Sequence, residues 1–498
     1  MSITDRFSLS SEVKGFLGQG PLESYIGGEW VKPADGRTMV TVDPGSAEPL
    51  AEFYVMGPAE VDKAVQAAAK AFRESGWATM APQERALHLH RFADLVAENA
   101  ELLADLEALD AGKVRSGTGF DLQLFGDWFR YYADLATQIS YRRDITIPGH
   151  EAREVRQPWG PCGFIFPWNF PLVLIAWGTA PALAAGNTVI VKPAEDTPLT
   201  SLYVPRLAEE AGIPPGVFNI IAGDGETAGA ALAHHPGLKR MGFTGSPEVG
   251  KMVAASCGAN LVPVKLELGG KGAAVVFDDV DVEDAAEKLT GAITFHTGQV
   301  CCDATRWIVH ERIHDDFVAA IRAKMAAVRI GHGFEADTQM GPVVSAKQRR
   351  RVVSYVERGM AEGAQALVPG GEARVSGFDG GFYVKPCLLA GSFDNVAARE
   401  EIFGPVAFLT KFRDEAEAIA LANSTPYGLG NSVWSTDMDR CNRVAEAMVA
   451  GNNWINAHNV FPLGVPYAGV NLSGLGGGVN SPETLWDYLR PMSVVRPL

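Results

Sequence analysis

Hydrophobic and polar positions follow two alternating rhythms along the chain. In 59–75 and 82–111, apolar residues recur every three or four positions opposite charged ones, which predicts amphipathic helices. Farther along, short apolar runs predicted as strands alternate with segments predicted as helices. Their order is strand 163–166, helix 175–185, strand 188–192, helix 199–211, strand 217–221 and a helix that runs through His234. This alternation predicts a parallel α/β sheet.

The same rhythm begins again after Gly269-Gly270-Lys271. It gives a strand at 273–277, a helix at 282–295, a strand at 306–309 and a helix at 313–328, and so predicts a second α/β unit. Two remote segments, 140–158 and 484–498, have the pattern of extended chain. We expect them to form a small shared sheet, or an arm that adds to another subunit.

One long segment could be mistaken for a membrane span. Residues 157–191 contain no charged side chain, and the segment is long enough to cross a bilayer. It also contains five prolines, and a lipid-exposed helix broken that often would leave backbone polar groups unpaired. A buried strand, loop and helix inside a globular core is the better interpretation.

Composition narrows the choice of partner. The 498 residues are 47% hydrophobic and 20% charged, as in ordinary globular proteins, and the formal net charge is −16. We find no stripe of Lys and Arg, so nucleic acid and anionic membranes are not expected as partners. The densest basic run, 348–351, is interpreted as a solvated helix face.

The cysteines indicate a reducing setting. There are six, and only Cys301 and Cys302 are adjacent. Because no pair or Cys/His cluster has zinc-ligand spacing, neither a disulfide framework nor a metal site is expected. The chain starts at Met1 without an apolar run, so no signal peptide is expected and a cytoplasmic location is favoured.

Two side chains have the chemistry of nucleophile and base. Cys301 follows Gly298-Gln299-Val300 in a predicted turn, where main-chain N–H groups can lower the pKa of a thiol. Free cysteines are more often buried packing residues, so the turn alone leaves both roles open. Glu267 lies between leucines, where apolar neighbours should raise its pKa and suit it to general-base work. A glutamate in such a run is also commonly paired or exposed at a strand end.

Other polar residues stand where a ligand could bind. Asn169, in Pro167-Trp-Asn-Phe-Pro171, is a candidate oxyanion donor, although a turn asparagine can simply satisfy its own backbone. Lys192 and Glu195 follow a buried strand, where parallel sheets bind ribose hydroxyls. Two Gly-containing turns open helices and could hold phosphate; they contain Gly225, Gly229, Gly245 and Ser246. The first is one residue longer than the usual dinucleotide fingerprint.

Taken together, in this order and spacing, the motifs closely resemble one family, the NAD(P)-dependent aldehyde dehydrogenases. The box Leu266-Glu267-Leu-Gly-Gly-Lys271 precedes Gly-Gln-x-Cys301, whose cysteine lies thirty-four residues after Glu267. Glu400-Glu-Ile-Phe-Gly-Pro405 and the Asn169 loop complete the pattern. The resemblance runs from Tyr25 to about Leu489.

The resemblance implies a three-part fold: a Rossmann-like parallel-sheet cofactor domain, an α/β catalytic domain and a small bridging β arm for oligomerisation. The implied boundaries are 1–139 and 159–268 for the NAD-binding domain, 269–480 for the catalytic domain, and 140–158 with 481–498 for the arm. A homodimer or homotetramer acting on a small-molecule aldehyde is expected.

The resemblance also assigns catalytic roles. Cys301 would add to the aldehyde carbonyl, and Asn169 with the Cys301 N–H would hold the oxyanion. Hydride transfer to nicotinamide would leave a thioester, which water activated by Glu267 would hydrolyse.

The implied cofactor is NAD. Glu195 would repel a 2′-phosphate, so NADP is less favoured. Lys192 and Glu195 would bind the adenosine ribose, Ser246 a phosphate, and Glu401 with Phe403 the nicotinamide end. The full implied cofactor set is Ile165, Trp168, Lys192, Glu195, Gly225, Gly229, Gly245, Ser246, Leu268, Glu401 and Phe403.

The resemblance implies an aromatic substrate pocket formed by Phe170, Leu174, Trp177, Val300, Cys302, Asn459, Phe461 and Tyr467. It has no Arg or Lys for a second carboxylate, so apolar or aromatic aldehydes are favoured over semialdehydes. An aromatic cage could also hold a betaine-type quaternary ammonium. Three other readings are a CoA-acylating relative, a non-redox thiol esterase and a non-catalytic protein. Glu267 counts against the first of these and the intact motif residues against the last.

Four residues depart from the family pattern. A frequent Lys is replaced by Gly178, and near the C-terminus Lys, Arg and Glu are replaced by Asn471, Gly477 and Gly478. In the family pattern, the Lys missing at 178 and the Glu missing at 478 belong to one proton or water path behind the general base. Because both the Lys and the Glu are absent, neither charge is left buried without its partner. Waters in the space left by the glycines are expected to carry the proton of Glu267 instead.

Overall fold

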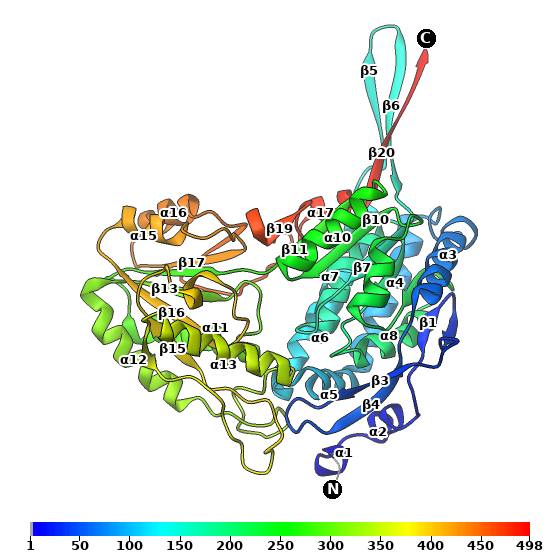
Figure 1. Ribbon diagram of the computed structural model, residues 1–498. Helices are drawn as coiled ribbons and strands as arrows, with labels where there is room; N and C mark the ends of the chain where they lie inside the picture. Colours follow the sequence, from blue (N-terminus) through cyan, green and yellow to red (C-terminus); the bar gives the residue numbers. More distant parts are fainter. Residues whose placement is uncertain (1–2) are drawn as a thin grey trace.

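The computed structural model describes residues 3–498 as two α/β bodies and a projecting arm (Figure 1). Met1 and Ser2, with which the expected first domain begins, lie outside the described residues. Each body has its own sheet, one of eight strands and one of seven. No helix in 3–498 is long and apolar enough to span a membrane.

The first sheet has five parallel strands at its centre and antiparallel strands at both edges. Its order is β19 (Gly474–Leu475), β11 (Val264–Leu268), β10 (Arg240–Gly245), β7 (Pro161–Ile165), β8 (Thr188–Lys192), β9 (Phe218–Ile220), β1 (Ser24–Ile26) and β2 (Glu29–Val31). Register pairs Ile165 with Lys192, and Gly245 with Leu268. These four residues, all predicted to bind the ligand, therefore lie together at the carboxyl ends of the parallel strands.

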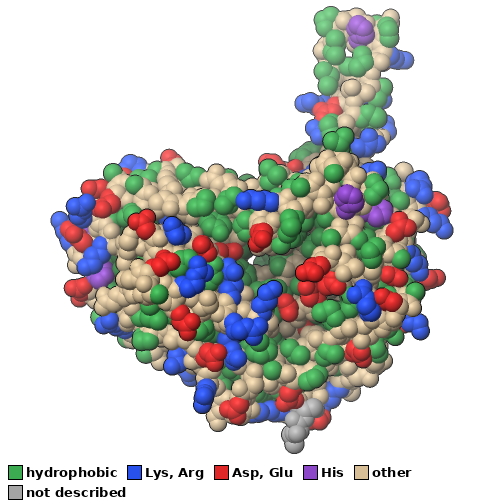
Figure 2. Space-filling view, viewed as in Figure 1, with side chains coloured by type: hydrophobic (Ala, Val, Ile, Leu, Met, Phe, Trp, Pro, Cys, Tyr) green, Lys and Arg blue, Asp and Glu red, His purple; other side chains and the backbone are tan. Residues whose placement is uncertain are grey.

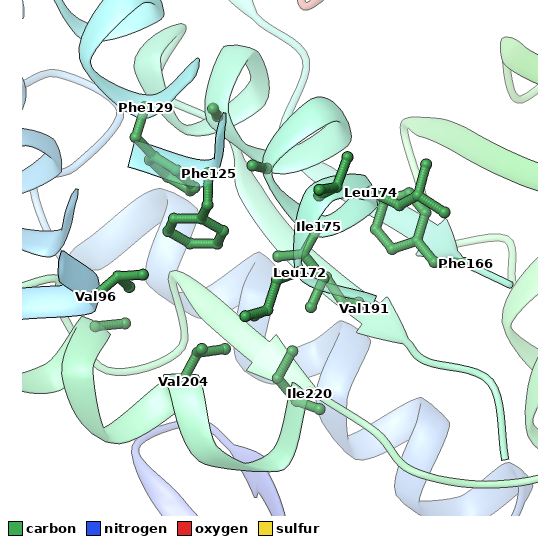
Figure 3. Close-up of a cluster of buried hydrophobic side chains, with 14 of the residues drawn as sticks. Val96, Phe125, Phe129, Phe166, Leu172, Leu174, Ile175, Val191, Val204 and Ile220 are labelled. Carbon is green, nitrogen blue, oxygen red and sulfur yellow. The ribbon is translucent and has the colours of Figure 1, made fainter. Parts of the chain in front are cut away.

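Helices cover this sheet and enclose the largest core cluster. They are α3 (Pro58–Glu74), α4 (Pro82–Glu98), α5 (Ala100–Ala111), α6 (Arg115–Gln138), α7 (Pro171–Ala184), α8 (Leu199–Glu210) and α10 (Pro247–Ala259). Every residue of α7 is buried. Figure 3 shows Leu172 and Ile175 of α7 between the rings of α6 and Val191 of the sheet. A proline in the first turn and Gly186 at φ +93° set the two ends of α7.

The second sheet is parallel except for one edge strand. Its order is β14 (Gln365–Val368), β15 (Cys387–Ala390), β16 (Val406–Phe412), β13 (Ala304–His310), β12 (Gly272–Val276), β17 (Gly430–Trp434) and β18 (Asn452–Ile455). The surrounding helices are α11 (Val282–Thr294), α12 (His314–Ala327), α13 (Ala346–Ala361), α15 (Glu415–Ala422) and α16 (Met438–Ala447). The sheet's β12 begins four residues after β11 ends, so the glycine-rich linker joins the two bodies directly.

The arm is a three-stranded antiparallel sheet that stands away from both bodies (Figure 1). It consists of β5 (Arg142–Ile147), β6 (His150–Pro158) and β20 (Leu489–Pro497). The expected extended segment 484–498 is wrong at its start, because 484–487 belong to the helix α17 (Pro482–Asp487). A proline in its first turn and the capping pair Ser481 and Thr484 form this helix.

The remaining elements are short. They are α1 (Ile3–Arg6), α2 (Ser11–Leu17), β3 (Thr38–Val42), β4 (Pro49–Tyr54), the π-helix η1 (Gly225–Gly229), α9 (Ala230–Ala233), η2 (Phe295–Gly298), η3 (Glu311–Ile313), α14 (Val396–Arg399) and η4 (Asn471–Ser473). Strands β3 and β4 pair in a sheet of their own.

The second sheet depends on one buried cation. Arg306 of β13 is 1% exposed and donates to the carbonyls of Lys271, Leu421 and Ala422, at 2.8, 2.9 and 2.7 Å. Burial lowers its pKa to about 10, so it stays charged at neutral pH. Through these bonds it ties the linker before β12 to the end of α15.

Replacing this cation should destabilise the second body. Arg306→Met removes three hydrogen bonds to main-chain carbonyls, of which that of Leu421 keeps a second donor, Ser424, and should lower the free energy of unfolding by about 3 kcal/mol or more. Urea unfolding followed by tryptophan fluorescence measures the loss. Arg312→Met, which removes a guanidinium of 77% side-chain exposure, should cost under about 1 kcal/mol. Equal losses in both variants would contradict the assignment.

Candidate active site

Cys301 lies on a strained turn between η2 and β13. Three consecutive residues before it have left-handed backbone: His296 at φ 44°, Thr297 at φ 58° and Gly298 at φ 66°. The turn is fixed by Gln299, which is fully buried, donates to the His296 carbonyl and accepts from the Val344 N–H at 2.9 Å. Strain of this kind persists only where the surrounding structure enforces it, and it is common at functional sites.

Glycines bring the motif backbones into contact. A Cβ at Gly270 would lie 2.4 Å from the Cys301 carbonyl oxygen, and one at Gly269 would lie 2.2 Å from the Glu401 carboxylate. A Cβ on Gly298 would lie 2.4 Å from Gly404. The motifs that are separated in the sequence therefore pack directly against one another in the fold.

Three candidate catalytic groups surround one cavity of about 480 Å³. Figure 2 shows a hollow between the two bodies. Cys301, Glu267 and Asn169 all line the cavity. Asn169 Nδ2 donates to the Gln299 carbonyl at 3.0 Å. A second N–H of that amide stays free to meet an oxyanion. Neither oxygen of Glu267 hydrogen-bonds to another group in residues 3–498.

The thiol chemistry separates the two adjacent cysteines. Hydrogen bonding from Cys302 is the main cause that lowers the pKa of Cys301, with a smaller contribution from Tyr467, whose hydroxyl lies 3.5 Å from Sγ. Burial raises the pKa of Cys302 well above its usual range. The thiolate therefore forms on Cys301.

Burial also raises the pKa of two carboxyls. That of Glu267 lies well above its usual range, because burial outweighs the nearby Lys265 cation, and the charge of Cys301 raises it further. Glu401, which accepts from the Gly270 N–H at 3.0 Å, has its pKa raised to about 7 by burial. The value of Glu401 suits a group that exchanges protons near neutral pH, and the raised pKa of Glu267 suits a general base.

Most residues expected around the ligand do line this cavity. They are Trp168, Asn169, Phe170, Leu174, Trp177, Gly245, Ser246, Glu267, Leu268, Val300, Cys301, Cys302, Glu401, Phe403, Phe461 and Tyr467. Asn459 is not among the lining residues. It lies behind Cys302, accepting from its thiol at 3.2 Å and donating to Asp303 at 3.0 Å, so it holds the cysteine pair instead.

The rest of the expected cofactor set gathers at the carboxyl ends of β7 and β8. A Cβ on Gly229 would lie 3.8 Å from Ile165 and 4.0 Å from Lys192. Lys192 is buried and donates to Glu195 at 2.9 Å. Gly225 faces open space. A buried lysine paired with a partly exposed glutamate, together with an open glycine, fits a ribose and a phosphate here.

The sequence interpretation missed one wall of the cavity. Helix α6 contributes Phe120, Leu124 and Trp128, which recur at helical spacing and could have been recognised from it. The expected solvated face at 348–351 is only partly solvated. Gln348 is buried and donates to the Phe403 carbonyl at 2.6 Å, and Arg351 donates to the Glu401 carbonyl at 2.5 Å.

Two of the four departures from the family pattern, Gly178 and Gly478, are closely packed, whereas Asn471 and Gly477 are exposed. A Cβ on Gly178 would lie 2.6 Å from Phe166 and 2.8 Å from Phe164. One on Gly478 would lie 2.3 Å from the Tyr467 carbonyl oxygen. These two glycines therefore do not leave a large space for waters; a cavity of about 20 Å³ lies beside Gly178. No group of three or more His, Cys, Asp or Glu in 3–498 is placed to hold a metal ion.

Comparison with known proteins agrees with this geometry. The model of the aldehyde dehydrogenase family matches residues 30–494. Betaine aldehyde dehydrogenase from Bacillus subtilis is 38% identical, covering 91% of this chain and 93% of its own. Phenylacetaldehyde dehydrogenase from Pseudomonas fluorescens is 38% identical, covering 92% of each.

A solved structure extends the likeness to three dimensions. Betaine aldehyde dehydrogenase from Staphylococcus aureus, in complex with NAD+, has a TM-score of 0.95 at 34% identity, over 98% of this chain and 97% of its own. The expected α/β fold class and family resemblance are confirmed, and the expected cofactor is the one in that complex. The chain belongs to the aldehyde dehydrogenase family.

Proposed function

We propose that this protein oxidises an apolar or aromatic aldehyde to its carboxylic acid with NAD and without CoA. The observation that carries the proposal is the placement of Cys301, whose pKa is lowered, and of the buried base Glu267 on one cavity. The presence of that base favours hydrolysis of the thioester over its transfer to CoA.

The chain's residues divide the oxidation into two steps. The Cys301 thiolate adds to the carbonyl carbon, and the resulting oxyanion accepts hydrogen bonds from Asn169 Nδ2 and the Cys301 N–H. NAD, which Lys192 and Glu195 would hold, would supply the hydride acceptor, and loss of the hydride from the carbonyl carbon would leave a thioester on Cys301. Glu267 then takes a proton from the attacking water, and the acid departs with the thiolate restored.

Electrostatics favour this order of events. The charge of the Cys301 thiolate raises the pKa of Glu267 while the thiolate is free. Acylation removes that charge, so the pKa of Glu267 falls. More of Glu267 is then in its ionised form when the thioester needs a base. The two groups are thus active in turn.

The substrate end of the cavity is a cluster of rings. Trp177 lies 5.0 Å from Tyr467 and 6.2 Å from Phe461, centroid to centroid, and Phe461 lies 5.4 Å from Tyr467. An apolar chain or ring would bury its surface here. A quaternary ammonium is the second candidate, because these ring faces attract cations. Asp121 also lines the cavity, but its carboxylate is paired with Lys113 at 2.6 Å.

The arm and the cysteines support the proposed assembly and location of the protein. The arm exposes Ile145, Ile147, Val494 and Val495, which favours pairing with another copy in a homodimer or homotetramer. All six cysteines are free, which fits the reducing cytoplasm.

A turnover panel tests the proposed function. NADH formation is measured with aliphatic, aromatic, betaine-type and semialdehyde substrates, with NAD or NADP, with and without CoA, and the product is identified. We expect free acid without CoA. The kcat/KM for apolar aldehydes should exceed that for semialdehydes by about tenfold or more, because the carboxylate of a semialdehyde would be buried without a partner. A product formed only with CoA would contradict the proposal.

The pH dependence of thiol alkylation tests the nucleophile. Because the Tyr467 hydroxyl helps to lower the pKa of Cys301, Tyr467→Phe should raise that pKa. The pH midpoint for iodoacetamide labelling of Cys301 should move upward, and labelling at pH 7 should slow by about three- to tenfold, as one hydrogen bond implies. An unchanged midpoint, or labelling that shifts to Cys302, would argue against the role of Tyr467.

Cofactor preference tests the Lys192–Glu195 edge. Glu195→Gln removes the carboxylate that would repel a 2′-phosphate, so kcat/KM with NADP should rise about tenfold relative to NAD. Steady-state kinetics with both cofactors measure the ratio. Glu210→Gln, at the far end of α8, removes the same charge and should leave the ratio unchanged. A ratio unaffected by Glu195→Gln would place the ribose elsewhere.

A further inference from the structure

A second, smaller cavity lies behind the proposed base. Its volume is about 20 Å³, and its walls include Phe164, Phe166, Gly178, Lys265 and Glu267. That volume holds one water molecule, which needs at least two polar partners. Glu267 lines this cavity as well as the large one, is 6% exposed, and has no hydrogen-bond partner in residues 3–498. One carboxyl group thus faces both spaces.

Lys265 is the cation of this small cavity. It lies two residues before Glu267 on β11, and side chains two apart on a strand project from the same face. Lys265 is 4% exposed, and its Nζ donates to Asp487 Oδ2 at 2.7 Å and to the Gly478 carbonyl. The Asp487 side chain is 30% exposed, so the ion pair reaches from the buried cavity to solvent.

Lys265 lies beside the two closely packed glycines that depart from the family pattern. The positions where the family pattern has Lys and Glu are Gly178 and Gly478, and their neighbours leave no room for a Cβ. Lys265 enters the same region from β11, and its Nζ donates to the Gly478 carbonyl itself. A buried lysine is costly unless it is paired, and here the partner is Asp487.

We propose that Lys265 and Asp487 form the proton exit of Glu267, across one water in the small cavity. The inference rests on the proposed function, in which Glu267 gains a proton during thioester hydrolysis. Glu267 gives its proton to the water, and the water gives one to Lys265 as Lys265 passes one to Asp487. Asp487 releases that proton to solvent. Glu267 is again ionised, and water, Lys265 and Asp487 return to their starting states.

Other charged groups around the pair are fixed. Arg240 of β10 lies 3.9 Å from Asp487 Oδ2, and it does not line the small cavity. The Tyr488 ring lies beneath both cations, 5.7 Å from Lys265 Nζ and 5.2 Å from the Arg240 guanidinium. Burial raises the pKa of Tyr488, of its neighbour Tyr132 and of Cys162, so these three stay neutral. On the side of the large cavity, Glu267 faces Cys301.

The test separates acylation from deacylation. Lys265→Met keeps the length of the side chain and removes its charge and protons. With the intact enzyme, rapid mixing with aldehyde and NAD should still give a burst of one NADH per subunit, because acylation does not use Lys265. Steady-state kcat should then fall about tenfold or more. Its acid limb should move to higher pH, because the lost cation no longer favours the ionised carboxylate of Glu267.

Three further variants make the result specific. Asp487→Asn blocks the exit and should also keep the burst and lower kcat. Lys265→Arg restores the cation but not the ready exchange of its proton, so it should recover the pH profile more than kcat. Arg240→Met is the matched control: it removes a buried cation from the same cluster but outside the cavity, and should leave burst and kcat near those of the parent. NAD affinity and the melting temperature check folding in each variant.

The outcomes distinguish the two proposals. Absence of any aldehyde-dependent NADH formation by the parent enzyme would overturn the proposed function itself. A normal burst in the parent and an unchanged kcat in Lys265→Met would overturn only the proton exit. An equal fall in Arg240→Met would mean that the general positive field matters and that the cavity does not, which would also overturn the exit.

Discussion

The site depends on one electrostatic constraint: Cys301 and Glu267 share a buried space in which two negative charges disfavour each other. Burial raises the pKa of Glu267, and the thiolate raises it further, whereas hydrogen bonds from Cys302 and Tyr467 lower the pKa of Cys301. The resting site therefore favours charge on sulfur. Once the sulfur is acylated, the charge can move to the carboxylate, so one constraint orders nucleophile and base in time.

The fold meets this constraint through close backbone contacts. Gly269 and Gly270 admit Glu401 and the Cys301 carbonyl at distances that a Cβ would forbid, and Gly298 does the same toward Gly404. The linker that contains the first two also joins the two sheets, and Arg306 anchors its end. The nucleophile's turn is thus positioned by both bodies at once.

Sequence patterns predicted the alternating elements at 163–234 and 273–328 and the residues at the centre of the cavity, because strand periodicity and glycine motifs are local signals. Helix α6 was not predicted, although Phe120, Leu124 and Trp128 follow its period. Asn459 was placed in the pocket wall, but its contacts with Cys302 and Asp303 depend on tertiary packing. The role of Lys265 needed the structure, since its neighbours Gly478 and Asp487 are more than two hundred residues away.

Trapping the acyl-enzyme in Glu267→Gln tests the central claim most directly. The variant is mixed with one aldehyde and NAD, NADH is counted, and the acylated peptide is identified by mass spectrometry. The account predicts one NADH per subunit, a stable acyl group on Cys301 and almost no further turnover. An acyl group on Cys302, or steady turnover at the parent rate, would contradict the division of work between Cys301 and Glu267.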